Sequence, residues 1–281
     1  MRRSGSLSWL PWTDMKVKEL TAWLENKYPA KAAEHWDNVG LLVGDDEAEV
    51  SHIFLALDLT EETLEEAIQA GADMIITHHP MIFGGIKKIN NHDFTGRKIM
   101  RLIRNNISYY AMHTNYDVLG MADLSADYLK LEEREVLSVT EETKDGCEGF
   151  GRVGVLPKQM SLRECGEFVK AALSLNDVKI YGDLEQPVHR AAICTGSGKS
   201  MISDVLAKGA DVYVTGDIDH HTGIDAVAAG LAVIDAGHYG TEYIFMDAMK
   251  KKLGENFPEL PITCAKVKSC LLYTSPSPRD S

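Results

Sequence analysis

The fold of this chain is constrained most by an alternation of short apolar runs with amphipathic segments, which occurs twice. The apolar runs predict strands, and segments with apolar residues three or four apart predict helices that cover them. The first unit runs strand 53–57, helix 60–70, strand 74–77, helix 95–105, strand 107–112; the second runs strand 192–195, helix 200–208, strand 212–215, helix 223–229, strand 232–235. The predicted fold class is therefore α/β: two related domains with mainly parallel strands flanked by helices, as pseudo-duplicated βαβαβ halves.

Residue matches between the halves favour a diverged duplication. Gly71-Ala-Asp73 followed by Thr77 recurs as Gly209-Ala-Asp211 followed by Thr215. A second motif also occurs in both halves with the same internal spacing: Ala111-x-His113-x-x-x-Asp117 in the first and Ala236-x-His238-x-x-x-Glu242 in the second. The alternative is chance, because Gly-Ala-Asp is a common turn from a helix into a strand. A histidine and a carboxylate at the same spacing weaken that alternative.

The chain divides into four predicted parts. Residues 1–14 form an N-terminal extension without regular structure, and helical periodicity begins just after Met15. Residues 15–131 form the first α/β half. Residues 132–268 form the second half, including a connecting segment, 132–188, with a strand signal at 151–156 and a capping box at Ser161-x-x-Glu164. Residues 269–281 form a Ser/Pro-rich tail, whose origin, native or not, the sequence leaves open.

Charge and composition exclude several classes of function. The formal net charge of −13 disfavours nucleic acid as a partner, because the sequence has no basic stripe to override it. No apolar run approaches the roughly 18 residues of a membrane span. Five cysteines without C-x-x-C spacing suit reduced thiols rather than a disulfide framework. Without a secretory apolar segment we expect a cytoplasmic protein, although Arg2 and Arg3 leave an organelle open.

Histidines at predicted strand ends are the main functional signal. Six of the ten histidines fall in four short motifs: His78-His79, His113, His220-His221 and His238. In open α/β sheets, ligands bind beyond the carboxyl ends of the strands. Imidazoles mixed with carboxylates suit zinc, iron, manganese or nickel, whereas cysteines are absent from these motifs. The sequence therefore predicts a transition-metal site, while the isolated His35, His52, His92 and His189 are interpreted as structural.

Two features of the motifs suit two metals rather than one. Pro80 ends the strand after His78-His79, so both neighbouring side chains can serve one site and face different ions. Asp117 and Glu242 are the nearby carboxylates, and a carboxylate can bridge two ions. The roles of His113, His220 and His221 stay open between orienting ligands and serving a substrate as acids. Asp58 either reaches the site or caps the following helix.

The turn Thr195-Gly-Ser-Gly-Lys-Ser200 resembles the end of a phosphate-binding P-loop but fails the full motif. The first glycine of that motif would fall at position 193, which is Ile193. A strand-to-helix turn with free N–H groups can still hold an anion. Its candidate anion- or substrate-binding residues are Gly196, Ser197, Gly198 and Ser200.

Five motifs in order make the chain similar to a known family. They are Trp36-Asp-Asn-Val-Gly-Leu-Leu42, Thr77-His-His-Pro80, His113-Thr-Asn-Tyr-Asp117, Thr215-Gly-Asp217 with His220-His221, and Gly237-His-Tyr-Gly-Thr-Glu242. Together they resemble the NIF-three-like dinuclear-metal-centre proteins (YbgI/YqfO; GTP cyclohydrolase I type 2 homologues). The resemblance implies two divalent ions per chain, held by His78, His79, Asp117, His238 and Glu242, with Glu242 as the bridge. It also implies a toroidal homohexamer, in the short form without a central inserted domain.

Three functions are compatible with these features. The first is a metal-dependent hydrolase, in which a metal hydroxide attacks the C8 region of a purine nucleotide, His113 or His220 moves protons, and the turn 196–200 holds phosphate. The second is a two-metal phosphoesterase or nucleotidase. The third is a non-catalytic metal-binding scaffold or chaperone with protein partners. The sequence leaves the metal and the physiological substrate open.

Overall fold

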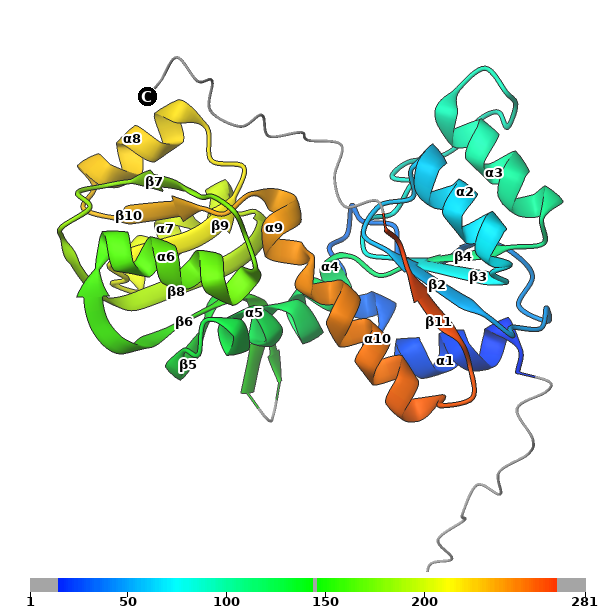
Figure 1. Cartoon of the computed structure of the whole chain (residues 1–281), viewed down its shortest axis with the longest axis horizontal. Coiled ribbons are helices and arrows are strands. Elements are labelled where there is room, and N and C mark those ends of the chain that lie inside the picture. The colour runs from blue at the N-terminus through cyan, green and yellow to red at the C-terminus, as the bar shows by residue number, and fades with distance from the viewer. Residues whose placement is uncertain (1–14, 144–145, 267–281) are drawn as a thin grey trace, which may run out of the picture.

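The computed structural model describes residues 15–143 and 146–266, which form two sheets that lie side by side (Figure 1). The first sheet has the order β1-β4-β3-β2-β11, with strands β1 (Gly40–Val43), β2 (Ile53–Ala56), β3 (Met74–Thr77), β4 (Ser108–Ala111) and β11 (Ile262–Cys264). Strands β2, β3, β4 and β11 run parallel, and β1 pairs antiparallel with β4. Every residue of β2, β3 and β4 is buried, as expected for strands covered on both faces.

Helices cover both faces of this first sheet. Helices α2 (Glu61–Ala70) and α3 (Phe94–Arg104) lie on one face, and α1 (Val17–Lys27) and α10 (Ile244–Asn256) lie on the other (Figure 1). The short helix η2 (Ala30–Ala32) follows α1 within the first half. The chain passes from β4 to the second half through α4 (Thr114–Tyr116), the π-helical turn η3 (Asp117–Met121) and α5 (Ala122–Tyr128).

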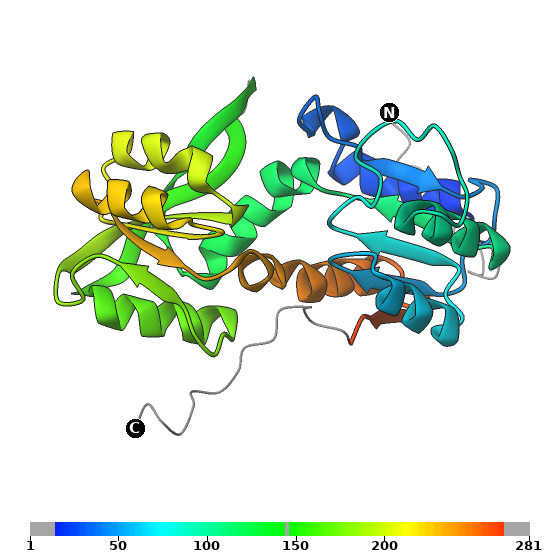
Figure 2. The same ribbon diagram turned by 90° about the horizontal axis from the view of Figure 1, so that it is seen from above.

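The second sheet has the order β5-β6-β8-β9-β10-β7. Its strands are β5 (Glu132–Thr143), β6 (Gly146–Ser161), β7 (Lys179–Tyr181), β8 (Pro187–Ser197), β9 (Val212–Gly216) and β10 (Ala232–Asp235). Strands β8, β9 and β10 are parallel, and the other pairings are antiparallel. Its helices are α6 (Leu162–Leu173), η4 (Lys199–Met201), α7 (Ile202–Ala207), α8 (His220–Ala228) and α9 (His238–Glu242). The β5–β6 ribbon projects beyond the body of this half (Figure 2).

The predicted repeat is visible in the hydrogen bonds of the two halves. Asp73 accepts from the backbone N–H groups of Ser51 and His52, which lie just before β2. Asp211 accepts in the same way from the N–H groups of His189 and Arg190 in β8. Both carboxylates thus tie the start of one parallel strand to that of its neighbour, and both units show βαβαβ order. The α/β class with related halves is confirmed.

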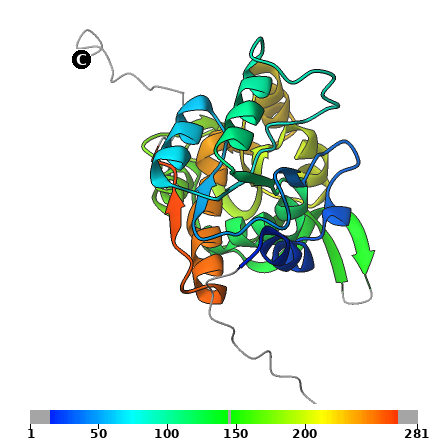
Figure 3. The same ribbon diagram turned by 90° about the vertical axis from the view of Figure 1, so that its right-hand side faces the viewer.

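One part of the predicted division is wrong. The boundaries place residues 132–268 in the second half, but helix α10 leads the chain back, and β11 pairs with β2 in the first sheet (Figure 3). A three-residue strand carries too little periodicity to be recognised in the sequence. The capping box at Ser161 and Glu164 does open α6 as predicted.

Two further expectations concern the ends of the chain and membranes. The extension 1–14 and the tail 269–281 lie outside the described residues. Among the helices of 15–143 and 146–266, none has the length and apolarity to cross a bilayer.

Candidate metal centre

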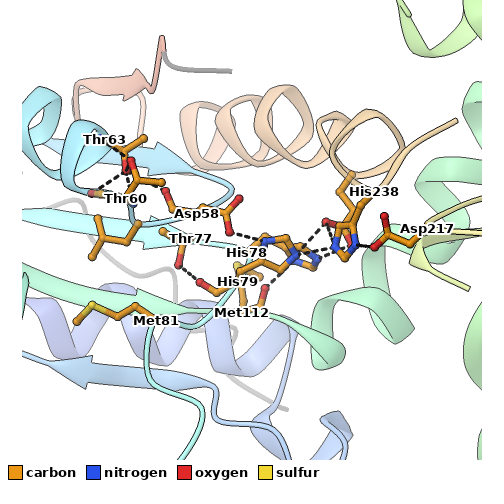
Figure 4. Close-up of polar contacts among 12 residues, drawn as sticks. Asp58, Thr60, Thr63, Thr77, His78, His79, Met81, Met112, Asp217 and His238 are labelled. Atoms are coloured by element: carbon orange, nitrogen blue, oxygen red, sulfur yellow. Dashed lines mark hydrogen bonds and ion pairs between the residues drawn. The ribbon is translucent and has the colours of Figure 1, made fainter. Parts of the chain in front are cut away.

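Histidine and carboxylate side chains from both halves meet where the carboxyl ends of the two sets of parallel strands face each other. His78 and His79 follow β3, His113 follows β4, and Asp117 opens the turn η3. The second half contributes His238 and Glu242, the first and last residues of α9. The five ligands that the resemblance implies therefore lie in one cluster, although they come from segments far apart in the chain. Figure 4 shows how His78 and His79 of the first half meet His238 of the second.

The cluster contains two triads that share Glu242. In triad A, His78 Nε2 lies 3.4 Å from Asp117 Oδ1 and 3.6 Å from Glu242 Oε1. In triad B, Glu242 Oε2 lies 3.0 Å from His79 Nε2 and 3.2 Å from His238 Nε2. Within each triad the ligand atoms lie within 4.8 Å of one another. The two carboxylate oxygens of Glu242 thus face different triads, which is the geometry of a bridging ligand.

Each histidine of the triads is held through Nδ1, so that Nε2 points into the cluster. Asp58 holds His79 at 2.9 Å, and Asp217 holds His238 at 2.8 Å (Figure 4). The His78 Nδ1–H group donates to the carbonyl oxygen of Met112 at 2.9 Å. A partner at Nδ1 fixes the tautomer that leaves the Nε2 lone pair free for a metal. Asp58 therefore reaches the site, and Thr60 rather than Asp58 caps α2.

Local sequence explains why these side chains converge. Both Thr77 Oγ1 and Tyr109 Oη donate to the carbonyl oxygen of His79, at 2.8 and 3.0 Å, and fix the backbone just after β3. In the second half, His238 and Glu242 are four residues apart and share one face of α9. Gly237, with φ of 75°, makes the turn from β10 into that helix.

The centre of the cluster is buried, and some of the polar atoms described there lack a hydrogen-bond partner. In the described residues, His78 Nε2 and Asp117 Oδ1 have no hydrogen-bond partner. Although burial opposes charging, Asp58 and Glu242 raise the pKa of His79 to about 10, and hydrogen bonding to Glu242 raises the pKa of His238 to about 9. Burial raises the pKa of Asp117, whereas the surrounding imidazoles hold the pKa of Glu242 well below its usual value against burial. Buried nitrogen and oxygen atoms that carry a lone pair and lack a hydrogen-bond partner fit a bound cation.

A cavity of about 420 Å³ opens onto the cluster. Its walls include Asp117, His113, His238 and Glu242 from the cluster, and also Gly196, Ser197 and Ser200 from the Gly-Ser turn. Gly198 is not in the wall, because its carbonyl oxygen accepts from Tyr213 Oη inside the second half. The predicted anion-binding turn is thus placed beside the candidate metal ligands, with three of its four residues facing the cavity.

Gly196 leaves the space that Glu242 occupies. Its φ is +68°, and a Cβ there would lie 2.4 Å from Glu242 Oε1 and 3.5 Å from His238 Nε2. The Gly196 N–H group donates to Thr241 Oγ1 at 2.9 Å, which ties the turn to α9. The glycine therefore allows the close approach of the turn to the Glu242 carboxylate.

The two predicted proton-transfer histidines have different places. His113 lies in the cavity wall and forms a group with His78 and His79, whose ligand atoms are within 4.8 Å of one another. His220 is not brought to the cluster: it is exposed at the first turn of α8, and its ring contacts that of His221. The helix begins three residues earlier than predicted because Asp219 caps it, and this places His220 on the surface.

Two residues outside the predicted set support the site. Asp37, whose side chain is fully buried, accepts from His113 Nδ1 at 2.9 Å and from the N–H of Thr114 at 3.0 Å. The His113 hydrogen bond holds the pKa of this carboxyl well below its usual range, against the effect of burial. Asp217 orients His238. Both lie in motifs that carry the family resemblance, and that was the only sequence signal for them.

Known proteins share these features over most of the chain. The model of the family Duf34/NIF3 (NGG1p interacting factor 3) matches residues 15–270. A GTP cyclohydrolase 1 type 2 homolog from Clostridium acetobutylicum is 37% identical, with 85% of this chain and 90% of the relative covered. Reduced HcgD from Methanocaldococcus jannaschii is 31% identical, with 90% and 98% covered and a TM-score of 0.77.

Two further matches concern overall fold and chain length. A Bacillus cereus protein related to NIF3 has a TM-score of 0.84 at 25% identity, with 93% of this chain and 100% of that chain covered. A homolog from Staphylococcus epidermidis aligns over 342 positions, more than the 281 residues of this chain, so that relative carries inserted sequence. This agrees with the short form expected here. The chain belongs to the Duf34/NIF3 family.

Proposed function

We propose that this protein is a metal-dependent hydrolase that holds two divalent ions and acts on a purine nucleotide. One observation carries the proposal: the two carboxylate oxygens of Glu242 face two separate triads. Triad A would take one ion through His78, Asp117 and Glu242, and triad B the other through His79, His238 and Glu242. Two such ions, when bound, would supply an acidified water as the nucleophile and would stabilise negative charge that develops during its attack.

The triads differ in donor chemistry. Triad A offers one imidazole and two carboxylates, whereas triad B offers two imidazoles and one carboxylate. Oxygen-rich sites suit manganese or iron, and imidazole-rich sites also suit zinc or nickel. Three protein ligands in each triad leave coordination positions free, as catalytic rather than structural sites do.

His113 is the group of this chain placed to move a proton. Its Nδ1–H group is held by the buried Asp37 carboxylate, so Nε2 faces the cavity beside the triads. A histidine oriented in this way can accept a proton during attack and return it to the leaving group. His113→Gln should therefore lower turnover more than it lowers metal content.

The cavity and the relatives together favour a nucleotide as the substrate. A volume of about 420 Å³ falls within the roughly 300–1,000 Å³ of small-molecule sites. No Lys or Arg of the described residues lines it, so phosphate groups would depend on the ions and on the turn 196–200, apart from the Gly196 N–H group that donates to Thr241. Similar proteins are named GTP cyclohydrolase 1 type 2 homolog, and GTP is the first nucleotide to test.

The test is turnover by protein reconstituted with Mn²⁺, Fe²⁺ or Zn²⁺ and supplied with GTP, followed by absorbance of the purine and by release of inorganic phosphate. We expect the guanine absorbance to be lost with the wild-type protein and to persist with His78→Ala. Phosphate release with an intact guanine would mean a phosphoesterase or nucleotidase instead. Metal binding without any turnover would support a scaffold or chaperone with protein partners, and would overturn the proposal.

The protein is also proposed to self-associate as a homohexamer, as the resemblance implies. Light scattering coupled to size exclusion measures the mass in solution directly. A monomer mass would contradict this part without affecting the metal site, because all five proposed ligands come from one chain.

A further inference from the structure

The segment 34–38 forms one rim of the cavity, and we call it the rim segment. Glu34 and Trp36 both line the cavity that contains Asp117 and Glu242. Trp36 is 53% exposed, which is unusual for so large an apolar side chain, and its ring lies 6.1 Å from that of His113. The only partner of the Glu34 carboxylate in the described residues is the exposed His35 imidazole, at 3.9 Å. An open aromatic face and a carboxylate that is free to accept hydrogen bonds from a ligand thus lie two residues apart at the mouth of the site.

The backbone of the rim segment is held at both ends. The Glu34 N–H group donates to Thr114 Oγ1 at 2.9 Å, and Thr114 itself donates to the buried Asp37 carboxylate. Asn38 Nδ2 donates to the carbonyl oxygen of Ile82 at 2.7 Å. Glu34 and Trp36 are therefore presented from a fixed backbone, which lowers the entropy lost when a ligand binds.

We infer that the rim segment recognises the base of the substrate and selects guanine: Trp36 stacks on the purine, and the Glu34 carboxylate accepts from its N1–H and 2-amino groups. Aromatic side chains stack on any base, so Trp36 supplies affinity without choice among bases. An ionised carboxylate only accepts hydrogen bonds. Guanine offers two adjacent donors on this edge, hypoxanthine offers one, and adenine presents an acceptor, N1.

Electrostatics at the rim favour the same assignment. The described lining residues contain carboxylates and no Lys or Arg, so a base with donors suits the rim better than a phosphate does. The side of the base that carries C8 is opposite the edge held by Glu34, so it would point inward towards the proposed ions, and the phosphates would lie towards the turn at Gly196 and Ser197. This inference rests on the proposed function, because it gives the nucleotide an orientation in that same cavity.

The experiment is calorimetric titration of Mn²⁺-loaded protein with four probes: the 5′-monophosphates of guanosine, inosine and adenosine, and ribose 5-phosphate. Trp36→Leu should weaken the three nucleotides roughly tenfold and leave ribose 5-phosphate unchanged. Glu34→Gln should reduce the preference for guanosine over adenosine monophosphate by about tenfold, because one acceptor becomes a donor. Phe94→Leu is the matched control, since Phe94 is 64% exposed but does not line the cavity.

The outcomes separate this inference from the proposed hydrolysis. If nucleotides bind in a Trp36- and Glu34-dependent manner but are never hydrolysed, the inference stands and the proposed reaction falls. If wild-type protein binds guanosine and adenosine monophosphates equally, or if both rim variants match Phe94→Leu, the inference is overturned even when GTP is turned over.

Discussion

The two halves share one order of parallel strands, β2-β3-β4 in the first and β8-β9-β10 in the second. The carboxyl ends of these strands contribute different residues to the cluster. The first half places His78, His79 and Asp117 in the cluster and holds the imidazoles rigidly. The second half contributes His238 and Glu242 from a single short helix and makes room with Gly196. Neither half alone contains all of triad A or triad B, since Glu242 belongs to both. The two related halves thus build one shared cluster, in which the carboxylate that faces both triads comes from one side only.

The largest effect is expected from substitution of Glu242, the residue that both triads share. Glu242→Gln removes the charge shared by both triads, so we expect both ions to be lost, as measured by plasma mass spectrometry per chain. His238→Ala affects triad B alone and should leave about one ion, bound to triad A. Equal metal content in the two variants would contradict the bridging role. Circular dichroism of both variants checks that the fold persists.

The second prediction compares two glycines with the same backbone. Gly196 and Gly71 both have φ of +68°, but a Cβ at Gly71 meets nothing within 4 Å. Gly71→Ala should lower the free energy of unfolding by about 1–2 kcal/mol, the cost of a left-handed alanine, with normal metal binding. Gly196→Ala should cost a similar amount and also weaken metal binding at least tenfold, because its Cβ displaces Glu242. Unchanged metal binding in Gly196→Ala would mean that the turn can move away.

The third prediction tests whether the halves orient their histidines equivalently. Asp58 and Asp217 hold His79 and His238 through Nδ1, and their side chains are equally exposed, at 52% and 53%. Asn at either position keeps the shape but not the charge, and Asn tolerates the φ of 57° at Asp217. We expect each variant to lose roughly 10- to 100-fold in metal affinity. A large effect at only one position would show that one half dominates triad B.

Much of the fold could be predicted because its main signals are local. Strand β3 was predicted at its observed bounds, since a buried parallel strand is a continuous apolar run. Histidines just after such strands converge because the carboxyl ends of parallel strands share one edge. Strand β11 was missed, because it has only three residues and pairs with β2, which lies more than 200 residues earlier in the chain.

The site was less predictable where its partners are distant in sequence. Asp37 holds His113 across 76 residues, and periodicity carries no information about such a pair. The assignment of ligands to two triads depends on how α9 orients Glu242 between the halves, which only the three-dimensional structure shows. His220 was wrongly grouped with the others because a histidine in a motif cannot reveal that a cap at Asp219 places it on the surface.

The fourth prediction uses pH to compare the metal-free and metal-loaded cluster. The pKa values of His79 and His238 rise from 6.5 to about 10 and about 9 in the folded chain. Their contribution to stability is thus complete below pH 6.5 and is lost as pH rises through 9 to 10. The thermal unfolding midpoint of chelator-treated protein should therefore fall between pH 6.5 and about pH 10. His238→Gln should make this fall with pH less steep. Metal needs neutral imidazoles, so metal affinity should rise with pH, the opposite direction.

The smallest expected effect concerns the scaffold that the two halves share. Asp73 accepts from two backbone N–H groups and from Ser51 Oγ, whereas Asp211 accepts from two N–H groups only. Alanine at either position leaves these donors without their carboxylate and should cost about 1–2 kcal/mol of unfolding free energy, with the larger loss at Asp73.

Chemical denaturation of Asp73→Ala and Asp211→Ala measures this difference, and the Asn variants, which keep one acceptor oxygen, should lose less. Both carboxylates lie at the amino ends of the parallel strands, away from the triads, so metal content should not change. A loss of metal in either variant would show that the strand starts transmit strain to the cluster. Unequal stability with unchanged metal would show instead that the halves have diverged in their scaffold independently of the site they build together.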